Sequence, residues 1–183
     1  MQKDYSNFTH AEILGDLYSA TEPRLVLLTG PSGSGKTTWC MELAKWAGSL
    51  GLDVDGLVSP SIYQDGIRTG IQLFDLQTGH SRLLAHRRTQ YSDGFTTADW
   101  QLNDETLQWG NHILAGCQTG QVFILDELGP LEFERGCGMT NGLDVIDQQR
   151  YQFACAVVRP AFLSLATSRW PAAKVIALQE YHS

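Results

Sequence analysis

A glycine-rich segment near the start of the chain has the residues needed to hold phosphate. Residues 30–37 read GPSGSGKT and match the pattern G-x-x-x-x-G-K-[S/T] at every position. Glycines let such a loop curl until successive backbone N–H groups point at phosphate oxygens, and the following helix turns its positive end to the same charge. We expect Lys36 to reach the β- and γ-phosphates and the Thr37 hydroxyl to ligate Mg²⁺. The predicted nucleotide-binding residues are Gly30, Pro31, Ser32, Gly33, Ser34, Gly35, Lys36, Thr37 and Thr38.

Two adjacent carboxylates follow a second apolar run. Asp126 and Glu127 come directly after residues 122–125, VFIL, which have the composition of a buried strand. The carboxyl end of such a strand faces the ligand crevice of an open α/β sheet. Taken alone, the pair reads better as two solvated acids at a strand end. Beside a complete phosphate loop, we predict that Asp126 holds Mg²⁺ and that Glu127 polarises the attacking water.

Two arginines are candidates for stabilising the charge that develops on the γ-phosphate. Arg159 follows the predicted strand 153–158, so it lies at another strand's carboxyl end. Arg68 lies on the predicted hairpin 63–76. We predict that Arg159 or Arg68 contacts the γ-phosphate, and we choose Arg159 as the catalytic one. Other arginines are weaker candidates because most arginines in a domain are simply solvated: Arg82, Arg87, Arg88 and Arg135.

Strands that alternate with helices must position these residues. Asp65-Gly66 predicts a hairpin turn, Asn103 predicts a helix N-cap, and Asn141-Gly142 predicts a break before a helix. The alternation predicts an α/β domain with a largely parallel sheet, and the segment 60–88 predicts antiparallel additions because it lacks a helix. Apolar runs predict strands at 24–28, 54–59, 71–76, 81–86, 121–125, 153–158 and 175–178, and helices at 36–50, 104–115, 143–149 and 161–167.

Composition narrows the class of protein. The chain has 183 residues, of which 43% are hydrophobic, and we expect one domain over residues 1–183 with a helical extension at 1–22. The net charge of −7 disfavours a general basic surface for nucleic acid or an anionic membrane. The chain shows neither a membrane-spanning apolar run nor a secretory signal, so the cytoplasm is the expected compartment. Its four cysteines form no C-x-x-C pair, and we expect free thiols.

Three segments together resemble the small P-loop nucleoside-triphosphatases of the thermophile and cancer-related NTPase family. They are GPSGSGKTT at 30–38, IRTGIQLFDLQTG at 67–79 and FILDELGPLE at 123–132. The resemblance implies a RecA-like three-layer α/β fold with a mixed central sheet, and slow Mg²⁺-dependent hydrolysis of ATP, GTP and other triphosphates. The resemblance also implies that Lys36 binds phosphate and Thr37 binds the metal. It implies that Asp126 is the Walker-B acid and that Glu127 is the base. Glu132 matches an acid after the family's Gly-Pro, without an assigned role.

Three functions therefore compete. The leading hypothesis is a nucleoside-triphosphatase with broad base specificity that acts on ATP and GTP. The second is a nucleotide or small-molecule kinase, which would need an acceptor pocket and a basic lid that residues 63–88 could supply. The third is a nucleotide-gated switch acting on a partner protein that the sequence does not identify. Products formed from Mg-ATP in the presence of an acceptor would separate the first two.

Overall fold

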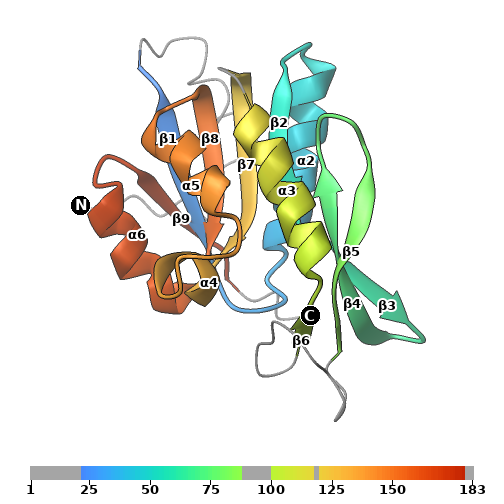
Figure 1. The fold of residues 1–183 in the computed structure, drawn as a ribbon. Helices are drawn as coiled ribbons and strands as arrows, with labels where there is room; N and C mark the ends of the chain where they lie inside the picture. The colour runs from blue at the N-terminus through green and yellow to red at the C-terminus, as the bar shows by residue number, and fades with distance from the viewer. Residues whose placement is uncertain (1–21, 88–99, 118–119, 180–183) are drawn as a thin grey trace.

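The structure is a computed structural model and describes residues 22–87, 100–117 and 120–179. Within these ranges, nine strands form one mixed sheet in the order β6-β5-β4-β2-β7-β8-β1-β9, and β3 pairs with β4 off this path. Figure 1 shows the sheet at the centre of the molecule. The helical extension predicted at the N-terminus falls almost wholly outside the described residues.

The parallel half of the sheet carries the phosphate loop and the acidic pair. Its neighbouring strands pair in parallel as β2-β7-β8-β1-β9. These runs are apolar because helices cover both faces, and their carboxyl ends point toward the bottom of Figure 1. The sequence predicted all five strands. Their bounds are Arg24–Thr29 for β1, Val54–Val58 for β2, Gly120–Leu128 for β7, Tyr151–Val158 for β8 and Lys174–Ala177 for β9.

The antiparallel additions are confirmed and extend one edge of the sheet. Asp65 and Gly66 form the predicted two-residue turn, and both have positive φ, 50° and 76°. The short β6 was not predicted, because three residues are too few to show an alternating pattern. The bounds are Ser61–Gln64 for β3, Ile67–Asp75 for β4, Ser81–Arg87 for β5 and Trp100–Leu102 for β6.

Helices cover the two faces of the sheet and complete three layers (Figure 1). On one face, α2 (Lys36–Ser49) buries Cys40, Leu43 and Ala47 in one apolar cluster. On the other face, α3 (Asp104–Gly116) and α5 (Thr140–Asp147) pack in a second cluster. As predicted, the Asn103 side chain caps α3 by accepting the Thr106 N–H at 3.0 Å. The remaining short helices are α4 (Pro130–Phe133), η1 (Pro160–Phe162) and α6 (Leu163–Arg169).

The predicted break at Asn141-Gly142 is wrong, because both residues lie inside α5. A Cβ at Gly142 would come within 2.5 Å of Leu125 Cδ2, so the glycine serves close contact between helix and sheet. Asn141 is tied to α3: its N–H donates to Asn111 Oδ1 at 3.0 Å, and its amide donates to Asn111 O at 2.8 Å. Tertiary contacts therefore override the turn preference of this dipeptide.

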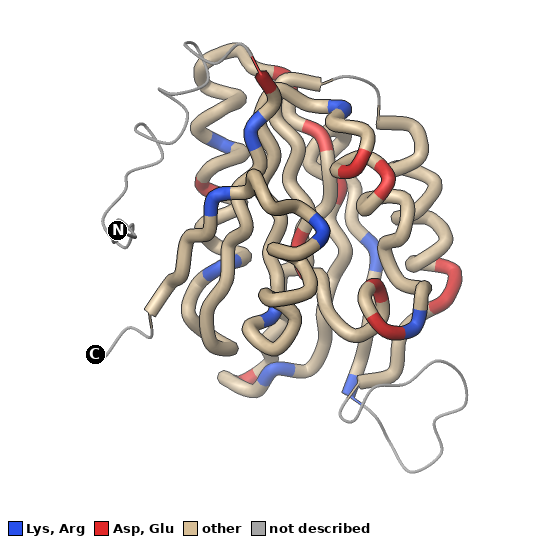
Figure 2. The backbone as a smooth tube through the Cα atoms, turned by 90° about the vertical axis from the view of Figure 1, so that its left-hand side faces the viewer, with Lys and Arg blue, Asp and Glu red and all other residues tan. Residues whose placement is uncertain are grey.

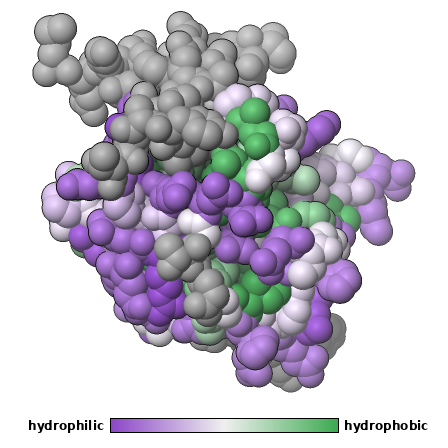
Figure 3. All heavy atoms as spheres, turned by 90° about the horizontal axis from the view of Figure 1, so that it is seen from above, coloured by the Kyte–Doolittle hydropathy of each residue, from purple (hydrophilic) through white to green (hydrophobic). Residues whose placement is uncertain are grey.

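Charged residues of both signs are spread along the described part of the chain (Figure 2). Lys and Arg lie interspersed with Asp and Glu along the chain in Figure 2. Figure 3 views the end opposite the phosphate loop, where hydrophilic residues surround smaller apolar areas. The four cysteines are free thiols, as predicted. In the part of the chain that the structure describes, no helix has the length and apolarity to cross a membrane.

Candidate active site

The phosphate loop joins the end of β1 to the start of α2, at the carboxyl edge of the parallel strands. Gly30, Gly33 and Gly35 all have positive φ, which side chains rarely tolerate. A Cβ at Gly30 would also lie 2.5 Å from the carbonyl oxygen of Leu178. Gly35 is the N-cap of α2 and places no side chain over the first turn. Since the first N–H groups of a helix have no partner within the helix, this end is open to an anion.

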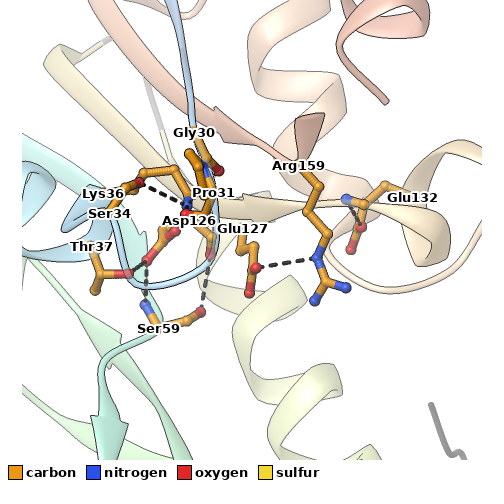
Figure 4. Close-up of polar contacts among 11 residues, drawn as sticks. Gly30, Pro31, Ser34, Lys36, Thr37, Ser59, Asp126, Glu127, Glu132 and Arg159 are labelled. Atoms are coloured by element: carbon orange, nitrogen blue, oxygen red, sulfur yellow. Dashed lines mark hydrogen bonds and ion pairs between the residues drawn. The ribbon is translucent and has the colours of Figure 1, made fainter. Parts of the chain in front are cut away.

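Lys36 turns into the loop that precedes it. Its Nζ donates to the carbonyl oxygens of Gly30 at 2.9 Å and of Pro31 at 2.5 Å, and lies 3.4 Å from Ser34 Oγ (Figure 4). Burial lowers the pKa of Lys36, while the nearby Glu127 and Asp126 carboxylates act in the opposite direction. The ammonium is therefore held within the loop by backbone carbonyl oxygens.

Asp126 forms the centre of a hydrogen-bonded group that joins three segments. Its Oδ2 accepts from Thr37 Oγ1 at 2.7 Å and from the Ser59 N–H at 3.1 Å, and its carbonyl oxygen accepts from Ser59 Oγ at 3.0 Å. Asp126 is only 3% exposed, and burial raises its pKa to about 6. A carboxylate and a hydroxyl in contact are the oxygen donors that suit Mg²⁺, so these residues fit the predicted metal site.

Glu127 and Arg159 form an ion pair beside this group. Glu127 Oε1 accepts from Arg159 Nε at 3.1 Å, and both side chains keep solvent contact, 33% and 46% exposed. Figure 4 shows Glu127 between Asp126 and Arg159. The pair forms because β7 and β8 are neighbours and both end here, and because Gly129 leaves room: a Cβ there would lie 3.0 Å from Arg159 Cδ. The peptide bond between Asp126 and Glu127 is cis.

Glu132, to which the sequence assigned no role, ties together the loop that follows β7. Its Oε2 accepts the Gly129 N–H and its Oε1 accepts the Met139 N–H, each at 2.9 Å. The side chain is buried, and this burial raises the pKa of Glu132. A Cβ at Gly138 would meet Glu132 Oε1 at 2.0 Å, so the loop closes tightly around the carboxylate. Glu132 thereby fixes the segment that separates α4 from α5.

The structure brings together most of the predicted site. Lys36, Thr37, Asp126, Glu127 and Arg159 lie in one cluster, as Figure 4 shows. The other arginine, Arg68, holds its guanidinium 4.9 Å from the centre of the Trp100 ring, and its Nε is buried without a hydrogen-bond partner. Its contact with the γ-phosphate stays a prediction.

Ser59 belongs to the site and was missed. It binds Asp126 through both its N–H and its hydroxyl. Its position in the sequence could have revealed it, because Ser59 directly follows β2, the strand beside β7. Polar residues at the carboxyl ends of adjacent parallel strands meet at one edge of the sheet.

Comparison with known proteins agrees with this geometry. A family model described as NTPase matches residues 25–141. The nucleoside-triphosphatase THEP1 of Caldivirga maquilingensis is 27% identical over 126 residues, which are 69% of this chain and 70% of the relative. The nucleoside-triphosphatase THEP1 of Thermofilum pendens is 33% identical over 108 residues, 58% of each chain. The matched regions thus span between 58% and 70% of the length of these two relatives.

Solved structures show the same fold. A human cancer-related nucleoside triphosphatase superposes with a TM-score of 0.63 at 22% identity, over 84% of this chain and 88% of that one. THEP1 from Aquifex aeolicus gives a TM-score of 0.63 at 19% identity, over 85% and 90%. The predicted three-layer fold and the family resemblance are confirmed. Since the family model covers well over half of the sequence, this chain belongs to the NTPase family, whose relatives named above are nucleoside-triphosphatases.

Proposed function

We propose that the chain is an Mg²⁺-dependent nucleoside-triphosphatase that hydrolyses ATP, GTP and other triphosphates to diphosphate and phosphate. The observation that carries the proposal is the group of side chains at one edge of the sheet. A phosphate loop with its lysine, a hydroxyl–carboxylate pair for a metal, and a partly exposed glutamate lie next to one another (Figure 4). Membership of the NTPase family supports hydrolysis as the reaction.

The loop and Lys36 would bind the phosphates. Backbone N–H groups of the loop and the first turn of α2 would point at the β- and γ-phosphate oxygens, and the Lys36 ammonium would exchange its loop carbonyls for them. All of these groups would contact phosphate and none would contact the nucleobase, which supports broad specificity for the nucleobase. When bound through Thr37 and Asp126, Mg²⁺ would neutralise charge on the β- and γ-phosphate oxygens.

Glu127 and Arg159 would act on the reacting groups. The Glu127 carboxylate would accept a hydrogen bond from the attacking water and draw off its proton as the water adds to the γ-phosphorus. Arg159 now pairs with this carboxylate, and its exposed side chain is free to turn from Glu127 to the γ-phosphate. When the triphosphate binds, such a turn would free the Glu127 carboxylate to act as the base. It would also bring the positive charge of Arg159 next to the negative charge that develops on the γ-phosphate.

The test is phosphate release from ATP, GTP, CTP and UTP with Mg²⁺, comparing the wild type with Glu127→Gln. The amide keeps the shape of the side chain but accepts no proton, so we expect turnover to fall at least about tenfold while nucleotide affinity is kept. Glu134→Gln is the matched control, because Glu134 is an exposed acid after α4 and should leave turnover unchanged. Retained turnover in Glu127→Gln would remove Glu127 from the mechanism.

A further inference from the structure

An apolar recess opens beside the acidic pair, on the side away from the phosphate loop. Asp126, Glu127 and Arg159 are part of its lining, whereas residues 30–37 are not. The cavity volume is about 70 Å³, and the wider empty space of about 620 Å³ around it includes open solvent. Among the described residues, its apolar walls include Ile71, Leu84, Trp100, Leu102, Leu107 and Met139.

The walls of the recess come from well-packed parts of the fold. Ile71 and Leu84 belong to β4 and β5 and are each only 8% exposed. The Trp100 ring forms another wall and is covered by the Arg68 guanidinium at 4.9 Å. A water molecule gains nothing from such walls, whereas an apolar group gains free energy by leaving water for them. The recess therefore fits an organic ligand better than the hydrolytic water alone.

The position of the recess decides what such a ligand could do. In phosphoryl transfer the attacking and leaving oxygens lie roughly in line through the γ-phosphorus. The loop and Lys36 would hold the leaving diphosphate side, and Glu127, which lines the recess, lies between Asp126 and Arg159 in Figure 4. A hydroxyl in the recess would therefore approach from the attacking side, with its proton directed at Glu127.

We propose that the recess binds a small alcohol with an apolar body and that this alcohol, in competition with water, accepts the γ-phosphoryl group. The inference rests on the proposed function, because it uses the same nucleotide site and the same base. The alcohol oxygen forms a bond to the γ-phosphorus as the bond to the β–γ bridging oxygen breaks. That oxygen leaves with the electron pair on the diphosphate, and the alcohol proton passes to Glu127. The products are a phosphate monoester and a nucleoside diphosphate.

The experiment incubates the wild type with Mg-ATP and equal concentrations of methanol, 1-butanol or benzyl alcohol, and quantifies monoester and free phosphate by ³¹P NMR. We expect the ratio of monoester to phosphate to rise at least about tenfold from methanol to benzyl alcohol, because each added carbon can contact the walls. Free phosphate as the sole product with every alcohol would overturn the inference and leave the proposed function standing. A ratio that does not depend on the apolar body would also overturn it.

A matched pair of variants ties the effect to the recess. Leu107→Trp should fill it and lower the ratio of monoester to free phosphate at least about tenfold. Leu165→Trp adds the same bulk at an exposed leucine of α6, outside the recess, and should change neither product. Equal monoester formation in both variants would contradict the proposed site.

Two further measurements keep the inference testable in other circumstances. Should Leu107→Trp fail to fold, Leu107→Ala enlarges the recess and should shift preference toward the larger 2-naphthylmethanol. An unchanged preference in Leu107→Ala overturns the inference. Should the wild type release no phosphate, the proposed function fails, and saturable binding of benzyl alcohol, weakened in Leu107→Ala, tests the recess by itself. Absence of such binding overturns the recess as a ligand site.

Discussion

Asp126 and Glu127 are adjacent in sequence, but their carboxylates lie in different environments. Asp126 is 3% exposed and accepts from Thr37 and Ser59, whereas the Glu127 side chain is 33% exposed and is paired with Arg159. A metal ligand benefits from being held by neighbours, and a base must reach the attacking group. The sequence predicted these two roles from the order of residues after an apolar run. The environments that separate them depend on one side chain of α2 and on the residues that directly follow β2 and β8.

The raised pKa of Asp126 predicts a pH-dependent cost of folding in the metal-free, nucleotide-free protein. Burial raises this pKa from 3.8 to about 6. The folded state therefore binds the proton more tightly than the unfolded state, so stability is lost as pH rises from 3.8 through about 6 and the loss is complete above it. Asp126→Asn keeps an oxygen acceptor and removes the charge, so we expect it to be more stable near neutral pH by about 3 kcal/mol.

The measurement is urea unfolding of the wild type and Asp126→Asn across this pH range. The difference in their free energies of unfolding should grow as pH rises and become flat above the folded pKa. Asp144→Asn serves as the control for a change from acid to amide, because Asp144 is an exposed acid on α5 away from the site. If the difference in free energy of unfolding between the wild type and Asp126→Asn did not change with pH, burial would not shift the pKa of Asp126.

Most elements could be predicted from periodicity alone. Apolar runs between turn residues predicted β1, β2, β7, β8 and β9, because strands buried on both faces show no polar alternation. The short elements β6 and α4 were not predicted, since three or four residues carry too little pattern. The start of α5 was placed too late because Asn-Gly is a turn dipeptide in isolation, and only the packing of Gly142 on Leu125 shows why it is helical.

The packing of α5 can be tested by adding a single methyl group. At Gly142 a Cβ would lie 2.5 Å from Leu125 Cδ2, so Gly142→Ala must displace the helix or a buried leucine. We expect a loss of about 1–3 kcal/mol of stability, somewhat reduced by the better helix propensity of alanine. Gly48→Ala in α2 is the control, because a Cβ there meets nothing within 4 Å and should raise stability by about 0.5–1 kcal/mol.

Chemical denaturation of both variants beside the wild type gives the two values. Opposite signs would support the close contact of α5 with the sheet. Equal stabilisation by both substitutions would show that Gly142 is not required for packing and that its place in α5 rests on the Asn141 hydrogen bonds alone.

Across the whole molecule, the site depends on segments that are far apart in sequence. Thr37 and Asp126 are 89 positions apart and meet at 2.7 Å, and Arg159 joins them from the end of β8. The rule that ligands bind at the carboxyl ends of parallel strands predicted this gathering. It could not predict the recess, because its walls require the packing of β4, β5 and β6 against α3. The half of the sheet that contains the unpredicted β6 is therefore the half that lines the recess.

Nucleotide binding should stabilise the whole fold in a metal-dependent way. A ligand that binds only the folded state adds about 3 kcal/mol at 100 times its Kd, which corresponds to roughly 6–12 °C in Tm for a chain of this size. Mg²⁺ with a non-hydrolysable triphosphate should give this shift in the wild type. Lys36→Met should lose most of it, because the phosphates lose the ammonium that now binds the carbonyl oxygens of Gly30 and Pro31.

The role of the metal is tested by removing it. With EDTA in place of Mg²⁺, the triphosphate charge is not neutralised, and we expect a much smaller shift in Tm. Thr37→Ala should show a reduced shift with Mg²⁺ and little further change on addition of EDTA, since the hydroxyl that would ligate the metal is gone. An equal shift with and without Mg²⁺ in the wild type would contradict a metal bound between Thr37 and Asp126, whereas an equal shift in Lys36→Met would contradict phosphate binding in the loop. The two outcomes can be told apart, because Lys36→Met removes a partner of the phosphates, whereas Thr37→Ala and the removal of Mg²⁺ affect the metal.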